Sequence, residues 1–185
     1  MRATRGRLIV VDGGGSSLVA AAKSLTAAVR REREGSGLST WDSSGIFTEL
    51  VSDESEDQPS ARTLTLLYAA DLAFRIRWQI RPALESGLSV VAAPYVETAK
   101  ALAISTGLPR KWVQELFRFA PKPDSCYSAI DRTAPAGRAA RTDYVDCFVG
   151  AVTSNGAALR AGDLRKQSIA YLAALEKKGR CKRFK

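Results

Sequence analysis

The most constraining feature of this chain is a short apolar segment that runs directly into a cluster of glycines. Residues 7–12 read RLIVVD, three glycines occupy 13–15, and the alanine-rich segment LVAAAKSLTAAVRRERE follows. Such an apolar run is typical of a buried strand, and alanine and leucine at helical spacing predict a helix. Ser16 and Ser17 are candidate N-caps of this helix, and Gly35 is a candidate C-terminal stop. The chain therefore opens with a strand, a glycine-rich turn and a helix.

The rest of the chain alternates between strand-like and helix-like segments. One long helix is predicted over 61–86, with a kink at Pro82. Strands that alternate with helices favour an α/β fold, in which a parallel sheet is covered on both faces to give a three-layer αβα sandwich. We expect a single domain over 1–185. The other predicted strands cover 38–41, 88–93 and 125–130, and the other predicted helices cover 96–106, 109–120 and 163–178.

Composition excludes several classes of function. The chain of 185 residues has no histidine, which removes the usual general base and a common metal ligand. Cys126, Cys147 and Cys181 are an odd number at wide spacing, so we expect neither a metal site nor a disulfide framework. No apolar run reaches the roughly 18–20 residues of a membrane span, and the apolar part of the N-terminus is too short for a signal peptide. We therefore expect a cytoplasmic protein without membrane contact.

The formal net charge is +9, and part of it lies in the basic tail 179–185. Two interpretations are open. The tail could neutralise nucleic-acid phosphates, or it could be a solvated and frayed terminus. We favour the second, because no recognised nucleic-acid motif accompanies the charges.

Four phrases carry a resemblance to a known family. They are LIVVDG, LLYAADLAFRIRWQIRPALESGLSVV, PYVET and PDSCYSAID. They resemble phrases of the thymidylate kinases in the same order and at close to the same spacing, over about residues 7–131. The resemblance implies a P-loop NTPase fold of the nucleoside monophosphate kinase type, with a lid region at about 132–145. It also implies a homodimer that pairs through the long helix 61–86.

The phosphate loop departs from the family's pattern. A P-loop reads G-x-x-x-x-G-K-[ST], in which backbone N–H groups cradle phosphates, lysine reaches the terminal phosphates and the hydroxyl residue holds Mg²⁺. Counted from Gly13, the second glycine, the lysine and the hydroxyl residue are replaced. A displaced pair, Lys23-Ser24, could restore lysine and serine, but a solvated helix residue is the simpler interpretation of Lys23. The degenerate phosphate loop thus comprises Gly13, Gly14, Gly15, Ser16, Ser17, Leu18, Val19 and Ala20.

The substrate-binding phrases of the family survive in part. In the phrase equivalent to T-R-E-P-G-G the acidic residue persists as Asp42, whereas the arginine is Trp41. The arginine of A-A-D-R is replaced by Leu72. Arg75 lies one helical turn further on. It could reach the same pocket, or it could pair with Asp71 at i,i+4 spacing, which we favour.

Two tyrosines and two arginines complete the candidate site. The phenylalanine that stacks on thymine in the family corresponds to Tyr68, which could stack on a base or pack in the core. The D-R-Y phrase retains only Tyr95, as a pocket wall or a buried packing residue. In the lid region, Arg138 and Arg141 are candidate anion contacts or parts of a solvated helix face. If a nucleoside monophosphate binds, we expect it in a pocket formed by Asp42, Tyr68, Arg75 and Tyr95.

These losses predict a protein without normal kinase chemistry. Phosphoryl transfer depends on positioning and charge neutralisation by groups that act together, and several are missing here. We therefore expect no cofactor and a binding or regulatory role, with Phe74, Trp78 and Ile80 available to an interface on the long helix. One alternative is a divergent but active dTMP kinase that uses ATP and Mg²⁺. A second is a basic protein associated with nucleic acid.

Overall fold

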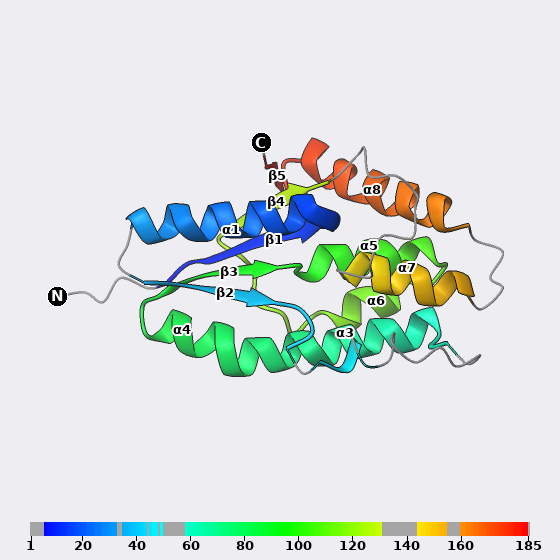
Figure 1. The fold of residues 1–185 in the computed structure, drawn as a ribbon, viewed down its shortest axis with the longest axis horizontal. Helices are drawn as coiled ribbons and strands as arrows, with labels where there is room; N and C mark the ends of the chain where they lie inside the picture. The colour runs from blue at the N-terminus through cyan, green and yellow to red at the C-terminus, as the bar shows by residue number, and fades with distance from the viewer. Residues whose placement is uncertain are drawn as a thin grey trace.

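The computed structural model describes residues 6–32, 35–43, 45–47, 49, 58–130, 144–154 and 160–184. Its centre is a parallel five-stranded sheet in the order β2-β3-β1-β4-β5. Helices lie on both faces of this sheet, with α1 on one face and α3 and α4 on the other (Figure 1). The predicted α/β sandwich is therefore confirmed. The strands are β1 (Leu8–Gly13), β2 (Ser36–Thr40), β3 (Ser89–Ala93), β4 (Ser125–Ala129) and β5 (Lys182–Arg183).

The helical segments follow the order that the sequence predicts, with one addition. The segment α7 was not predicted, although its sequence YVDCFVGAVTS is strongly apolar. None of the described helices is both long and apolar enough to cross a membrane. The helical elements are α1 (Gly15–Glu32), α3 (Ala61–Arg75), η1 (Ile76–Ile80), α4 (Arg81–Glu85), α5 (Val96–Ser105), α6 (Arg110–Leu116), α7 (Tyr144–Ser154) and α8 (Ala161–Lys177).

Successive side chains of the central strands point to opposite faces of the sheet, and both faces are buried. Val10 of β1 and Ala92 of β3 belong to the larger core, under α3, α5 and α7. Val11 and Val91 belong to a smaller core beneath α1. Because both faces are covered, these strands read as continuous apolar runs and do not alternate with polar residues.

The long predicted helix is interrupted by a π-helical stretch. The segments α3, η1 and α4 follow one another without a break, and the N–H of Arg81 bonds to the carbonyl of Ile76 across the wider turn. Pro82 is the second residue after this stretch. Since proline lacks an N–H and crowds the preceding turn, a wider turn just before it accommodates the ring. The predicted irregularity is present, but it precedes the proline.

The start of the first helix differs from the sequence expectation. The helix begins at Gly15, so Ser16 and Ser17 lie in its first turn and neither is the residue that precedes it. At the other end, the described part of the helix stops at Glu32, and Gly35 has a positive φ of 96°, the conformation expected of a glycine that ends a helix.

Two expectations about the C-terminal region were wrong. Cys126 of β4 and Cys181 form a disulfide, although the cysteine spacing gave no support for one. Only the folded sheet brings these two residues together, because 55 positions separate them along the chain. The basic tail is also not frayed through its described part. It forms β5, and the N–H of Phe184 bonds to the carbonyl of Ser128 on β4.

Candidate functional site

The connection between β1 and α1 is a single residue. Only Gly14 separates the last residue of β1 from the first residue of α1. A P-loop needs several loop residues whose N–H groups surround the phosphates, and here those positions are already helical. Of the replaced residues, Leu18 is buried in the core beneath α1, whereas Val19 and Ala20 are exposed. Lys23 is an exposed residue well inside α1, far along the helix from its start.

Gly13 is required by packing. A Cβ atom on this residue would lie 1.9 Å from the carbonyl oxygen of Ala129, and its φ of 149° is one that other residues rarely adopt. The close approach of β4 therefore explains this glycine without any bound phosphate.

The residue before Gly13 organises the start of α5. The Oδ1 atom of Asp12 accepts hydrogen bonds from the N–H of Tyr95 at 3.0 Å and from both the N–H and the hydroxyl of Thr98 at 2.9 Å. Its Oδ2 atom is buried and has no hydrogen-bond partner. Burial raises the pKa of Asp12 to about 6, and the hydrogen bonds from Thr98 and Tyr95 oppose this shift.

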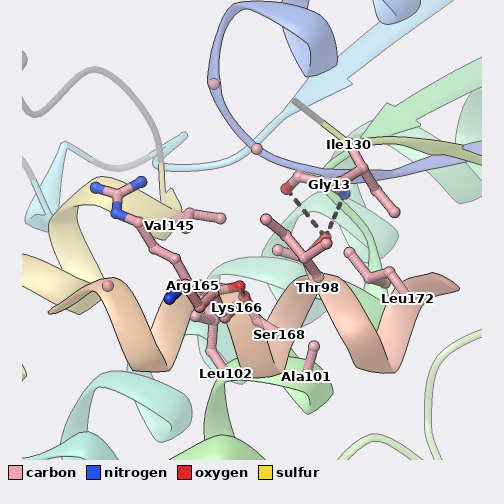
Figure 2. A pocket seen from close by; sticks show the side chains of 14 residues that line it. Gly13, Thr98, Ala101, Leu102, Ile130, Val145, Arg165, Lys166, Ser168 and Leu172 are labelled. Atoms are coloured by element: carbon pink, nitrogen blue, oxygen red, sulfur yellow. Dashed lines mark hydrogen bonds between the residues drawn. The ribbon is translucent and has the colours of Figure 1, made fainter. Parts of the chain in front are cut away.

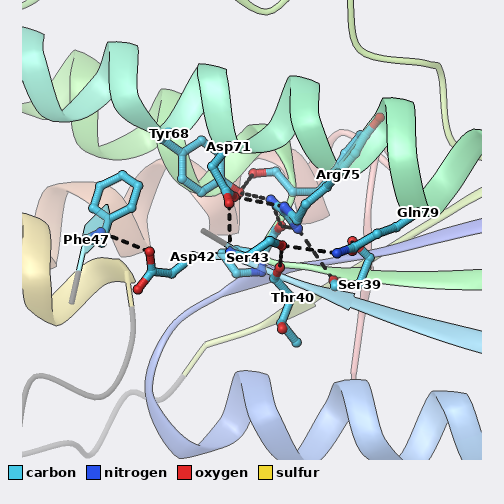
Figure 3. A network of polar contacts seen from close by, with 11 residues as sticks. Ser39, Thr40, Asp42, Ser43, Phe47, Tyr68, Asp71, Arg75 and Gln79 are labelled. Carbon is cyan, nitrogen blue, oxygen red and sulfur yellow. Dashed lines mark hydrogen bonds and ion pairs between the residues drawn. The ribbon is translucent and has the colours of Figure 1, made fainter. Parts of the chain in front are cut away.

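Arg75 is fully buried at the centre of a polar network (Figure 3). Its Nε atom lies 2.9 Å from Asp71 Oδ2, which establishes the i,i+4 ion pair that we favoured. Both terminal nitrogens donate to the carbonyl of Pro94, at 3.3 and 3.2 Å, and one of them also donates to the hydroxyl of Tyr68. That hydroxyl in turn donates to the carbonyl of Tyr95 at 2.7 Å. The network joins the long helix to the carboxyl end of β3.

Tyr68 is covered by other aromatic side chains. Its exposed fraction is 0%, and its ring lies 4.3 Å from that of Tyr144, between centroids. Phe117 contacts it edge to face at 6.2 Å. In this structure the protein's own rings thus occupy the space around Tyr68. Tyr68 is therefore a core residue in this structure, and base stacking by it stays a prediction.

The other predicted substrate residues have structural partners as well. Asp42 adopts a positive φ of 55°, and its Oδ1 atom accepts a hydrogen bond from the N–H of Phe47 at 2.9 Å. Trp41 packs edge to face against Phe47, with centroids 5.3 Å apart. Tyr95 is 2% exposed and donates its hydroxyl proton to the carbonyl of Pro121. Leu72 is fully buried in the larger core.

The structure therefore brings Tyr68, Arg75 and Tyr95 into one network, as a common site would require, but it buries all three. Asp42 follows the carboxyl end of β2 and lies beside Ser43, whose N–H bonds to Asp71 in this network (Figure 3). Arg138 and Arg141 lie outside the described residues. Among the residues that are described, no group of three or more cysteine, aspartate or glutamate side chains is placed to hold a metal ion.

A pocket of about 230 Å³ opens beside the β1–α1 turn (Figure 2). We call it the turn pocket. Thr98 lies on its wall and bonds to the N–H and the carbonyl of Gly13. Helix α8 forms the opposite wall. The residues that line the pocket are Gly13, Gly14, Gly15, Thr98, Ala101, Leu102, Ile130, Val145, Gly162, Arg165, Lys166, Ser168, Ile169 and Leu172.

Two curated proteins with similar sequences are both named as probable thymidylate kinases. The chain is 31% identical over 124 residues to "Probable thymidylate kinase 2" of Saccharolobus solfataricus, across 65% of this chain and 57% of that protein. It is 32% identical over 87 residues to "Probable thymidylate kinase" of Staphylothermus marinus, across 46% of this chain and 44% of that protein. The chain is related to the thymidylate kinases. The matched regions span about half the length of these relatives. No protein-family model matches the chain.

A solved structure supports the same relationship at the level of the fold. The thymidylate kinase of Ehrlichia chaffeensis superimposes with a TM-score of 0.68 over 97% of this chain and 88% of that chain, at 12% sequence identity. The expected nucleoside monophosphate kinase fold, with its parallel sheet and flanking helices, is therefore confirmed. The thymidylate kinase resemblance seen in the four phrases is also confirmed.

Three features of the site were not found from the sequence. Asp12 was noted only as the end of a strand, Thr98 was not singled out, and Tyr144 lies in the helix that was missed. For Asp12 a signal existed, since an acidic residue at the carboxyl end of a buried strand needs hydrogen-bond donors nearby. For Tyr144 none existed, because its contacts with Tyr68 join residues far apart in the chain.

Proposed function

We propose that this chain is a thymidylate kinase-like protein that does not catalyse phosphoryl transfer. The observation that carries the proposal is the direct turn from β1 into α1, with a single intervening residue, Gly14. Without a loop there is no ring of backbone N–H groups around a phosphate, and without lysine and serine no side chain neutralises its charge or holds Mg²⁺.

The buried network around Arg75 supports the same proposal. Every ring and guanidinium group there already has a partner within the protein, and Tyr68 and Arg75 are both 0% exposed. A nucleoside monophosphate could contact them only after these side chains had separated. We therefore propose a binding or regulatory role for this chain, and we do not expect it to turn over dTMP.

The test is an assay of ADP formation with ATP, Mg²⁺ and dTMP, together with thermal unfolding in each ligand separately. We expect no dTMP-dependent ADP formation and no rise in unfolding temperature with ATP–Mg²⁺, because a ligand that does not bind the folded state cannot stabilise it. An active thymidylate kinase assayed in parallel is the positive control. Turnover, or stabilisation by ATP–Mg²⁺, would support the alternative of a divergent dTMP kinase.

We propose that the partner is a second copy of this chain, in a homodimer that pairs through the long helix. Phe74 and Trp78 are one turn apart and 47% and 60% exposed, which places two large apolar side chains on the outer face of the helix. Ile80, the third expected interface residue, is instead fully buried in the larger core.

The proposed dimer predicts a clear effect of one substitution. Trp78→Lys should convert a dimer into a monomer, as measured by light scattering after gel filtration, because the ammonium group would have to be buried at the interface. Arg81→Lys, which keeps the charge of an exposed residue on the same helix, is the control and should leave the mass unchanged. A wild-type mass equal to that of one chain would contradict the dimer.

A further inference from the structure

The turn pocket lies where open α/β sheets bind their ligands. β1 and β4 are neighbours in the sheet. From β1 the chain continues to β2 at one edge of the sheet, whereas from β4 it continues to β5 at the opposite edge. Such a reversal creates a crevice at the carboxyl ends of the two strands. Gly13 ends β1, Ile130 follows β4, and both residues line the pocket.

The walls of this pocket are apolar. Ala101 and Leu102 come from α5, Ile169 and Leu172 come from α8, and Ile130 adds a further side chain. Its volume of about 230 Å³ exceeds the ~150 Å³ of a cavity that binds benzene. A polyphosphate would lose its water in such a pocket and gain few donors in return, whereas an apolar ring or short chain would gain by burial.

The charge at the pocket selects for an anion. Two cationic residues and no carboxylate side chain line it. Arg165 is already paired, since its Nη2 atom lies 2.5 Å from Asp146 Oδ1. Lys166 is exposed and makes no hydrogen bond or ion pair with any residue of the described ranges. Figure 2 shows both side chains on α8, next to the apolar wall.

We propose that the turn pocket binds a small amphiphilic monoanion, an apolar ring or short chain that carries one carboxylate. The apolar part occupies the space between α5 and α8, and the carboxylate pairs with Lys166. This site rests on the same short β1–α1 turn as the proposed loss of kinase activity, so the experiment has to separate the two.

The experiment is calorimetric titration of the full chain with n-octanoate and with n-octanol, its uncharged counterpart. We expect octanoate to bind more tightly than octanol. Lys166→Gln should weaken octanoate binding about three- to fivefold, the effect of one exposed ion pair, and leave octanol unchanged. Lys177→Gln, on the same helix but outside the pocket, is the matched control and should change neither affinity.

Two further variants fill the pocket. Ile169→Trp and Ile130→Trp each place a larger side chain in the cavity from a partly buried position, on different elements. Each should abolish binding of both probes, and unfolding followed by circular dichroism shows which variant keeps the fold. Octanoate binding that persists in a folded variant, equal affinity for octanoate and octanol, or no binding at millimolar octanoate would each overturn the proposal.

An ATP–Mg²⁺ arm distinguishes this inference from the proposed function. Saturation with ATP–Mg²⁺ should leave octanoate binding unchanged. Displacement of octanoate would overturn the proposed loss of the phosphate site, whereas failure of octanoate to bind in the absence of nucleotide would overturn only the pocket.

Discussion

Replacing Arg75 with methionine should lower the free energy of unfolding by about 3–5 kcal/mol, the cost of breaking a buried ion pair from one side. The substitution leaves the carboxylate of Asp71 buried without its partner and removes both donors to the carbonyl of Pro94. The hydroxyl of Tyr68 loses its donor as well. Urea unfolding at neutral pH measures the change.

Two variants test the cause of this effect. Arg77→Met makes the same change two residues away, at an exposed position where the guanidinium lies over the ring of Trp78 at 5.2 Å. It should cost no more than about 1 kcal/mol. The double variant Asp71→Asn/Arg75→Met should recover part of the loss, because no unpaired charge remains buried. Equal losses for Arg75→Met and Arg77→Met would show that the network does not stabilise the fold.

The second large effect is expected at Asp12 and depends on pH. Burial raises the pKa of this carboxyl from 3.8 to about 6, so the folded protein holds its proton more tightly than the unfolded chain does. The stabilisation by the protonated form is therefore complete below about pH 3.8 and is lost as the pH rises through about 6. At neutral pH the buried charge costs about 2–3 kcal/mol, from 1.36 kcal/mol for each pKa unit.

Asp12→Asn should remove this cost. Asparagine keeps an oxygen for the N–H groups of Tyr95 and Thr98 and carries no charge, so the variant should be more stable than wild type at pH 7 by about 2–3 kcal/mol. The difference should shrink toward zero near pH 4. Urea unfolding across this pH range measures it. Glu85→Gln, which removes an exposed carboxylate, is the control and should show no such trend. A destabilised Asp12→Asn variant at pH 7 would show that burial does not disfavour the charge of Asp12 there.

These two networks tie together the elements around the carboxyl ends of β1 and β3. Arg75 ties the long helix to the end of β3, while Asp12 ties the end of β1 to the start of α5. Both networks meet at the backbone of residues 94–95, the position of the family's D-R-Y phrase.

The sequence by itself determined the class of fold and most of its elements. The segments that form β1 and β3 are continuous apolar runs, and every residue in them is buried in the fold. Such runs are typical of strands in a sheet that is covered on both faces. The i,i+4 pair of Asp71 and Arg75 could also be predicted, because helical geometry alone brings such residues together. Local periodicity carries this kind of information.

Only the tertiary structure decided what became of the site. The disulfide of Cys126 with Cys181, the contact of Tyr68 with Tyr144 and the walls of the turn pocket all join segments that are distant in sequence. No spacing rule encodes such contacts, because they depend on how whole helices and strands pack. The sequence showed that the phosphate-binding residues are absent. The fold then showed how the chain is arranged there: β1 passes into α1 through one glycine, Gly14.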